Sequence, residues 1–174
     1  MAKHSDPIKR FPIAGKMHPV RGGAWVAEGA VVLADVTFGE DANVWFGCVL
    51  RGDDAPITIG ARTNIQDGTI VHADPGVANH IGEDVTVGHR CVLHGAKVGD
   101  RCLIGMGAIL LAGSEIGDEC LIAAGAVVKE NMKVPPRSLV VGIPGKIVRQ
   151  ITDEEVAAFR ESAAGYVNQV NLYR

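Results

Sequence analysis

Residues 98–128 read VGDRCLIGMGAILLAGSEIGDECLIAAGAVV, and an aliphatic side chain returns at every sixth position of this stretch. The returning residues are Val98, Ile104, Leu110, Ile116, Ile122 and Val128. A helix would need apolar residues three and four apart, so this period excludes a helix. The fifth position of each hexad is small, and glycine often follows the first, as tight corners require. The stretch therefore predicts short strands joined by corners.

The same step of six recurs upstream in three blocks. These are Val26, Val32, Phe38, Val44 and Leu50, then Ile59, Ile65 and Val71, then Ile81, Val87 and Leu93. If each hexad supplies one strand and one corner, three hexads close a triangular coil and each coil buries its neighbour. The pattern resembles the hexapeptide repeat of left-handed parallel β-helices. It predicts an all-β solenoid over about residues 20–134 of a single domain, 1–174.

The period slips at three places, between residues 50 and 59, between 71 and 81, and between 93 and 98. We interpret these slips as insertions or a deletion at corners. Functional loops tend to occur at such places, because a corner tolerates extra residues that a paired strand does not.

The composition of the chain argues against several classes of function. The chain has 174 residues, 47% of them hydrophobic and 21% charged, with a net charge of −3. It has no basic patch that would indicate nucleic-acid binding, and its longest uncharged run is too short to span a bilayer. The polar start around Lys3 and Asp6 is unlike a signal peptide. We expect a cytoplasmic protein without nucleic-acid or membrane partners.

The four cysteines could indicate a disulfide or a zinc site, but their positions in the repeat argue against both. All fall at the small, inward fifth position of a hexad, namely Cys48, Cys91, Cys102 and Cys120. No CxxC spacing is present. We expect reduced thiols that pack as small buried hydrophobic groups.

After Val128 the repeat is expected to stop, and prolines and glycines over 135–150 predict an extended exit segment. A C-terminal helix is predicted over 152–172. Thr152 and Glu155 form a capping box, with Ile151 and Val156 placed for a hydrophobic staple. Its apolar side is Val156, Phe159, Ala163, Tyr166 and Val170. It should pack outside the prism or on a neighbouring subunit.

Counting hexads places three of the histidines. If Ile59, Ile65 and Val71 begin faces one, two and three of a coil, the next coil repeats those faces at Ile81, Val87 and Leu93. His72 and His94 then both follow the first residue of a face-three hexad. They should stack on adjacent strands about 4.8 Å apart, pointing outward. His89 belongs to face two, on another side of the prism.

A metal shared between subunits follows from this placement. If face two of one chain meets face three of the next, the contact is heterologous, and closing it gives a ring, most simply a homotrimer. His89 could then join His72 and His94. Three imidazoles with an open fourth position are the ligand set of a catalytic zinc.

Other polar residues gather on the same two faces. Arg51 precedes His72 by one coil on face three, with Asp53 at the adjoining corner, and buried charges need partners. We expect Arg51 and Asp53 to be paired at or across the interface. Gln66 and Asp67 precede His89 by one coil on face two. Gln66 could hydrogen-bond a metal-bound hydroxide.

The motifs are similar to those of the γ-class carbonic anhydrase family. They are Arg51-Gly52-Asp53-Asp54, Asn64-Ile65-Gln66-Asp67-Gly68, Val71-His72, Gly88-His89 and His94-Gly95. The resemblance implies a homotrimer in which His72 and His94 of one chain and His89 of the next bind zinc, or iron or cobalt.

The resemblance also implies roles for residues around the metal. Arg51 and Asp53 would support the trimer and the site, while Asn64 and Gln66 would position hydroxide and substrate. Asp67 would belong to the same polar network. Tyr166 and Asn168 look like the family's tyrosine and asparagine near the metal.

The implied reaction is reversible hydration of CO2 to bicarbonate by a metal-bound hydroxide at the subunit interface. This reaction also releases a proton, which must leave the site for the solvent. The insertion 74–80 lacks the glutamate that serves as proton shuttle in archaeal members of the family. Asp54 matches another family acid, and His80 carries an imidazole that can exchange a proton near neutral pH.

Three alternatives stay open. A hexapeptide acyltransferase would share the repeat but need only one histidine as a base. A CoA-thioester hydrolase could use the same metal site. A catalytically weak metal-binding trimer would keep the ligands without efficient proton export.

Overall fold

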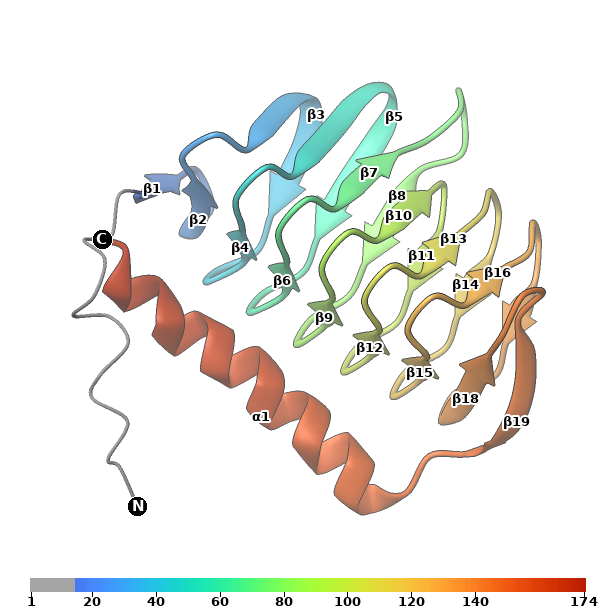
Figure 1. Cartoon of the computed structure of the whole chain (residues 1–174). Helices are drawn as coiled ribbons and strands as arrows, with labels where there is room; N and C mark the ends of the chain where they lie inside the picture. The colour runs from blue at the N-terminus through green and yellow to red at the C-terminus, as the bar shows by residue number, and fades with distance from the viewer. Residues whose placement is uncertain (1–14) are drawn as a thin grey trace, which may run out of the picture.

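The computed structural model describes residues 15–174, so the polar start around Lys3 and Asp6 lies outside the described residues. The described chain is a parallel β-solenoid of about 6 turns with one C-terminal helix (Figure 1). The predicted fold class is confirmed. Within residues 15–174, no helix is long and apolar enough to cross a membrane.

Face two is a sheet of short parallel strands closed at each end by an antiparallel strand. Its order is β1 (Met17–Val20), β2 (Ala24–Ala27), β4 (Asn43–Val44), β6 (Asn64–Ile65), β9 (Thr86–Val87), β12 (Leu103–Ile104), β15 (Leu121–Ile122), β18 (Ser138–Val141) and β19 (Lys146–Gln150). The end strands β1 and β19 pair antiparallel to β2 and β18, which covers edges that would otherwise expose unpaired backbone groups.

Faces one and three share two long strands, β3 (Val31–Phe38) and β5 (Val49–Ile59), which turn a corner and pair on both faces. Face three continues through β7 (Ile70–His72), β10 (Val92–His94), β13 (Ile109–Leu110) and β16 (Val127–Val128). Face one continues through β8 (Asn79–Ile81), β11 (Lys97–Val98), β14 (Glu115–Ile116) and β17 (Lys133–Val134).

The register follows the hexad count. Ile59 pairs with Ile81, Ile65 with Val87, and Val71 with Leu93, so each face repeats at the positions that the period predicts. The first residues of the hexads form the core, and Leu50, Ile65, Leu93, Ile104 and Leu110 are fully buried. The small fifth positions fill the space beside them.

All four cysteines are free and buried, as predicted. Burial raises the pKa of Cys48 and of Cys91 to about 11, so these thiols stay protonated at neutral pH. They pack in the core as small apolar groups.

One corner carries a column of charged residues in the left-handed region, where glycine would be expected. The column is Asp41, Arg62, Asp84, Arg101, Glu119 and Arg137, each with φ between 55° and 59°. A non-glycine residue there costs about 1 kcal/mol or more. The signs alternate from coil to coil, and Arg62 pairs with Asp84 at 2.6 Å while Arg101 pairs with Glu119 at 3.0 Å. These partly exposed pairs offset part of the strain and favour the native register.

The solenoid extends beyond the end expected at residue 134. Val140 continues the step of six from Val134, and β18 pairs in parallel with β15. The predicted extended exit segment is therefore a hairpin, β18–β19, whose first strand is a further strand of face two. Pro135 and Pro136 obscured this, because they occupy the corner that precedes the strand.

The C-terminal helix α1 (Asp153–Gln169) lies along the outside of face two, followed by a short 3-10 turn η2 (Val170–Leu172) (Figure 1). The predicted capping box is present, with Thr152 Oγ1 accepting from Glu155 N and Glu155 Oε2 accepting from Thr152 N. Ile151, Val156 and Phe159 pack on outward leucines of face two. The helix thus covers one face of its own chain.

We expect Leu110→Ala, which removes a fully buried side chain, to lower the free energy of unfolding by about 2–5 kcal/mol. A leucine outside the solenoid offers a control, because Leu172 is the same residue type but 50% exposed. Leu172→Ala should cost clearly less in chemical denaturation of the two variants. Equal losses would contradict the assignment of Leu110 to the core.

Candidate metal centre

His72 and His94 stack on neighbouring strands of face three. Strands β7 and β10 pair in parallel with His94 opposite His72, and the two ring centroids are 5.4 Å apart. The side chains are 15% and 32% exposed, so both rings lie at the surface rather than in the core. The predicted pairing of these two imidazoles is confirmed.

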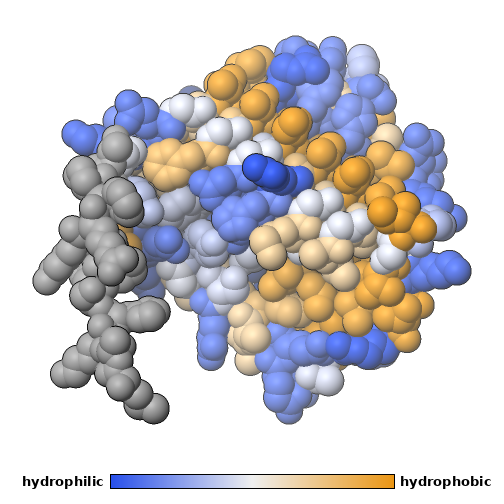
Figure 2. Space-filling view, in the orientation of Figure 1, coloured by the Kyte–Doolittle hydropathy of each residue, from blue (hydrophilic) through white to orange (hydrophobic). Residues whose placement is uncertain are grey.

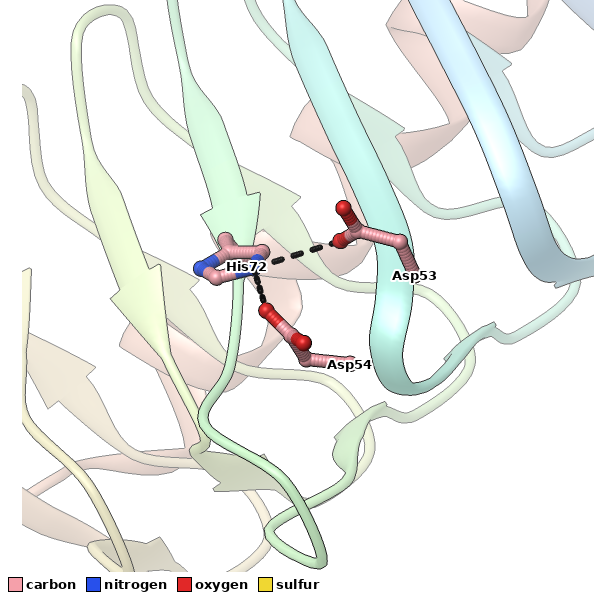
Figure 3. Close-up of side chains that lie close together, drawn as sticks. All are labelled: Asp53, Asp54 and His72. Atoms are coloured by element: carbon pink, nitrogen blue, oxygen red, sulfur yellow. Dashed lines mark hydrogen bonds and ion pairs between the residues drawn. The ribbon is translucent and has the colours of Figure 1, made fainter.

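Two carboxylates from the turn in β5 point at the ring of His72 (Figure 3). Its Nε2 lies 3.1 Å from Asp54 Oδ2 and 3.4 Å from Asp53 Oδ1. Possible ligand atoms of these three residues all lie within 4.8 Å of one another. Nitrogen and carboxylate oxygen donors so close together favour a cation beside His72.

Arg51 balances these acids from within the same chain. Its Nη1 donates to Asp53 Oδ2 at 2.6 Å and lies 3.7 Å from Asp54 Oδ2. The hydrogen bond from Arg51 holds the pKa of Asp53 below its ordinary value, so this carboxylate remains ionised. Of the two arrangements expected for Arg51 and Asp53, the structure contains the pair within one chain.

Gly52 between them has a packing role. A Cβ at this position would lie 2.4 Å from the backbone oxygen of Asp35, in the neighbouring strand β3. Only glycine lets β3 and β5 approach this closely. The Arg-Gly-Asp sequence is therefore explained by the architecture of the corner.

His89 lies on face two, after β9, and is held by Asp67. Its Nδ1 is 2.9 Å from Asp67 Oδ2, and both side chains are 42% exposed. A carboxylate at one ring nitrogen fixes the ring and leaves Nε2 available, as is usual for histidines that bind metals. The count that placed Asp67 at the same phase as His89 predicted this neighbour.

One chain does not assemble the three histidines. Within residues 15–174, His89 belongs to the sheet of face two while His72 and His94 belong to face three. The donor set nevertheless fits a metal, because His72 and His94 are stacked and His89 has its outer carboxylate in place.

Asn64 and Gln66 are buried beside His89. Gln66 Nε2 donates to Asn64 Oδ1 at 3.1 Å, and Gln66 is only 5% exposed. The two predicted positioning residues therefore form one hydrogen-bonded pair. Gln66, His89 and Tyr166 line an open groove of about 570 Å³ between face two and α1.

Tyr166 reaches this region from α1. It packs edge-on against Trp45, with ring centroids 5.4 Å apart. Burial, followed by the charge of Asp67, raises the pKa of Tyr166, so its hydroxyl stays protonated. Asn168, two residues on, is exposed at the surface.

The two candidate proton carriers lie in different places. Asp54 touches His72. His80 is exposed on face one, away from face three, and is the register partner of Lys97 in the paired strands β8 and β11. Asp74 was missed by the sequence analysis, although its Oδ1 lies 3.4 Å from His94 Nε2. The sequence could have indicated Asp74, because it lies at the start of the corner insertion, two residues after His72.

Thr86 and Ser162 were also missed. Thr86 Oγ1 and Ser162 Oγ are 3.1 Å apart and connect face two to α1 beside Asn64. Residue spacing alone does not indicate which side of a docked helix meets which strand.

The chain is similar to known hexapeptide-repeat proteins and carbonic anhydrases. Residues 80–110 and 95–130 match a family described as "Bacterial transferase hexapeptide (six repeats)". A Methanocaldococcus jannaschii protein named "Probable carbonic anhydrase" is 49% identical over 142 residues, which cover 82% of this chain and 89% of that protein. "Gamma carbonic anhydrase 2, mitochondrial" of Arabidopsis thaliana is 41% identical over 86% of this chain, which spans 56% of that relative.

Among solved structures, a hexapeptide transferase family protein from Anaplasma phagocytophilum has a TM-score of 0.85 and 35% sequence identity. The match covers 90% of this chain and 92% of that one. The fold is thus shared with proteins named as transferases, whereas several relatives in sequence, including the two above, are named carbonic anhydrases. On the identity and coverage of those relatives, the chain belongs to the γ-class carbonic anhydrase family.

Proposed function

We propose that this protein catalyses the reversible hydration of CO2 to bicarbonate as a homotrimer, with one zinc per subunit interface. His72 and His94 of one chain and His89 of the next would hold the metal. The observation that carries the proposal is the division of three histidines between two faces, with His89 already held by Asp67.

The outer surface of face three supports a second copy as its partner. Outward side chains on successive strands form an apolar column, which consists of Val31, Val49, Ile70, Val92, Ile109 and Val127. Val31 and Ile70 are 46% and 44% exposed. Figure 2 shows a row of hydrophobic side chains running obliquely over the region where Figure 1 draws these strands. A continuous apolar column beside His72 and His94 is typical of an interface.

The other two faces of the described chain differ from face three. Helix α1 packs on face two but leaves His89 42% exposed, and the outward positions of face one include Thr37, His80, Lys97 and Lys133, all of them exposed and polar. Burying face three against the side of the next chain that carries His89 is a heterologous contact, which closes most simply as a ring of three.

Zinc bound by three imidazoles would supply a Lewis acid that lowers the pKa of a coordinated water to about 7, and iron or cobalt would act similarly. The chain's own residues position the reactants. Gln66 offers an amide beside His89 in a partly buried groove, and Asn64 holds that amide in place. Arg51 keeps Asp53 ionised and so stabilises positive charge near His72.

Each hydration of CO2 releases one proton, which must reach solvent. Asp54 Oδ2 is a suitable carrier, because it lies 3.1 Å from His72 Nε2 while its side chain is 43% exposed. A group that touches both the site and water can pass a proton outward. His80 would have to act from face one, so we favour Asp54.

Protein purified without oxygen should contain about one zinc or iron per chain and hydrate CO2 in stopped-flow assays, because three imidazoles form a catalytic ligand set. His94→Ala should lose both the metal and the activity. Lys97→Ala, which removes an exposed side chain of face one, is the matched control and should retain both.

Two results would count against the proposal. Metal without hydration in the natural protein would move the assignment to thioester hydrolysis, to be tested with acyl-CoA substrates, or to a metal-binding trimer. A protein without metal that transfers an acyl group from CoA would be a hexapeptide acyltransferase.

Ile109→Asp should convert the trimer to monomers, because it places a carboxylate within the apolar column, where burial without a partner costs several kcal/mol. Thr37→Asp, on the exposed side of face one, should leave the trimer intact. Light scattering during size-exclusion chromatography measures both. A trimeric Ile109→Asp variant would exclude face three as the interface.

A further inference from the structure

Four polar side chains form a hydrogen-bonded chain from the candidate metal centre to the C-terminal helix. Gln66 Nε2 donates to Asn64 Oδ1 at 3.1 Å, and Asn64 Nδ2 donates to Thr86 Oγ1 at 2.9 Å. Thr86 Oγ1 is in turn 3.1 Å from Ser162 Oγ in α1. The first three residues are at most 5% exposed. Water therefore has little access to these groups.

The directions of the two hydrogen bonds that join Asn64 to Thr86 and to Gln66 follow from one backbone carbonyl. Asn64 Nδ2 lies 3.3 Å from the oxygen of Val85, which can only accept. The amide nitrogen of Asn64, and not its oxygen, must therefore face Val85 and Thr86. Since Asn64 donates to Thr86 Oγ1, the Thr86 hydroxyl is free to donate its own hydrogen to Ser162.

The same constraint fixes the amide of Gln66. Asn64 presents its oxygen to Gln66, so Gln66 must turn its nitrogen toward Asn64. Its own oxygen, Oε1, then points the other way. The reversed amide would bring two oxygens together in a buried place, which is disfavoured because neither would have a donor.

Thr86 is also an unusual residue for the surface on which it lies. Thr86 occupies an outward position of face two, and the corresponding positions of the later coils are Leu103, Leu121 and Leu139. Those leucines pack on α1. A leucine or valine at position 86 would serve helix packing equally well, so the hydroxyl indicates another role.

We propose that Thr86 and Ser162 are positioning residues that hold the oriented amide of Asn64 in place, and through it the amide of Gln66, so that Gln66 Oε1 accepts a hydrogen bond from the reacting water. The inference rests on the proposed function, and it concerns residues that do not themselves touch substrate. It makes helix α1 part of the site, because Ser162 provides the last hydroxyl, held in place by its buried neighbour Ala163.

The test begins with metal-free protein, so that it does not depend on activity. Side-chain amide signals of Asn64 and Gln66 are observed by NMR after labelling asparagine and glutamine with 15N, and Gln66→Glu assigns the Gln66 pair. Thr86→Val, which keeps the shape but removes the hydroxyl, should shift both pairs and speed their hydrogen exchange. Thr86→Ser should restore them.

Catalysis provides the second measurement. In metal-loaded protein we expect Thr86→Val to lower kcat for CO2 hydration about tenfold, the effect of losing one buried hydrogen bond, with little change in KM. Metal content and trimer mass should not change, and Thr86→Ser should recover kcat. Ser162→Ala removes the hydroxyl at the partly exposed end and should give the same changes more weakly. This second variant keeps the test decisive if Thr86→Val folds poorly.

The outcomes separate the two proposals. Unchanged Gln66 amide signals in both Thr86→Val and Ser162→Ala would overturn the positioning role, whatever happens to activity. Shifted signals in a protein that never hydrates CO2 would leave the hydrogen-bonded chain established, and would overturn both the proposed function and the catalytic purpose assigned to Thr86 and Ser162.

Discussion

The site depends on the parallel register between successive coils. Because each hexad buries the same two positions, a strand cannot slip by one residue without turning its apolar side chains outward. The pairing of Val71 with Leu93 in the core therefore forces His72 to lie beside His94 on the surface. The same constraint stacks Asp67 with His89 on the next face. Core packing, rather than any local preference of the histidines, sets the geometry of these candidate ligands.

The three faces of the solenoid have different outer surfaces, and this difference leads from fold to function. One is covered by α1, one is polar, and one carries an apolar column next to two histidines. A single chain leaves His89 apart from the other ligands, so the proposed reaction requires assembly. Arg51 and the neighbouring acids lie at the edge where the chains would meet, and their pairing within one chain limits the charge left unpaired there.

Much of this could be predicted from the sequence, because a period of six converts residue number directly into position. The stacking of His72 on His94, the inward cysteines and the capping box at Thr152 all follow from counting. The strand at Val140 was missed because prolines at its corner obscured the period. Asp74 and the contact of Thr86 with Ser162 depend on how a corner insertion folds and how a helix docks, and neither has a period to count.

The central claim is that the metal is shared between chains, and mixed trimers test it most directly. His89→Ala and His94→Ala, each purified alone, should bind no metal. Trimers refolded from equal amounts of the two should regain about a quarter of the sites, because an intact site then needs His72 and His94 from one variant and His89 from the other. Metal analysis of the mixture decides the matter, and no recovery in well-formed mixed trimers would contradict a shared site.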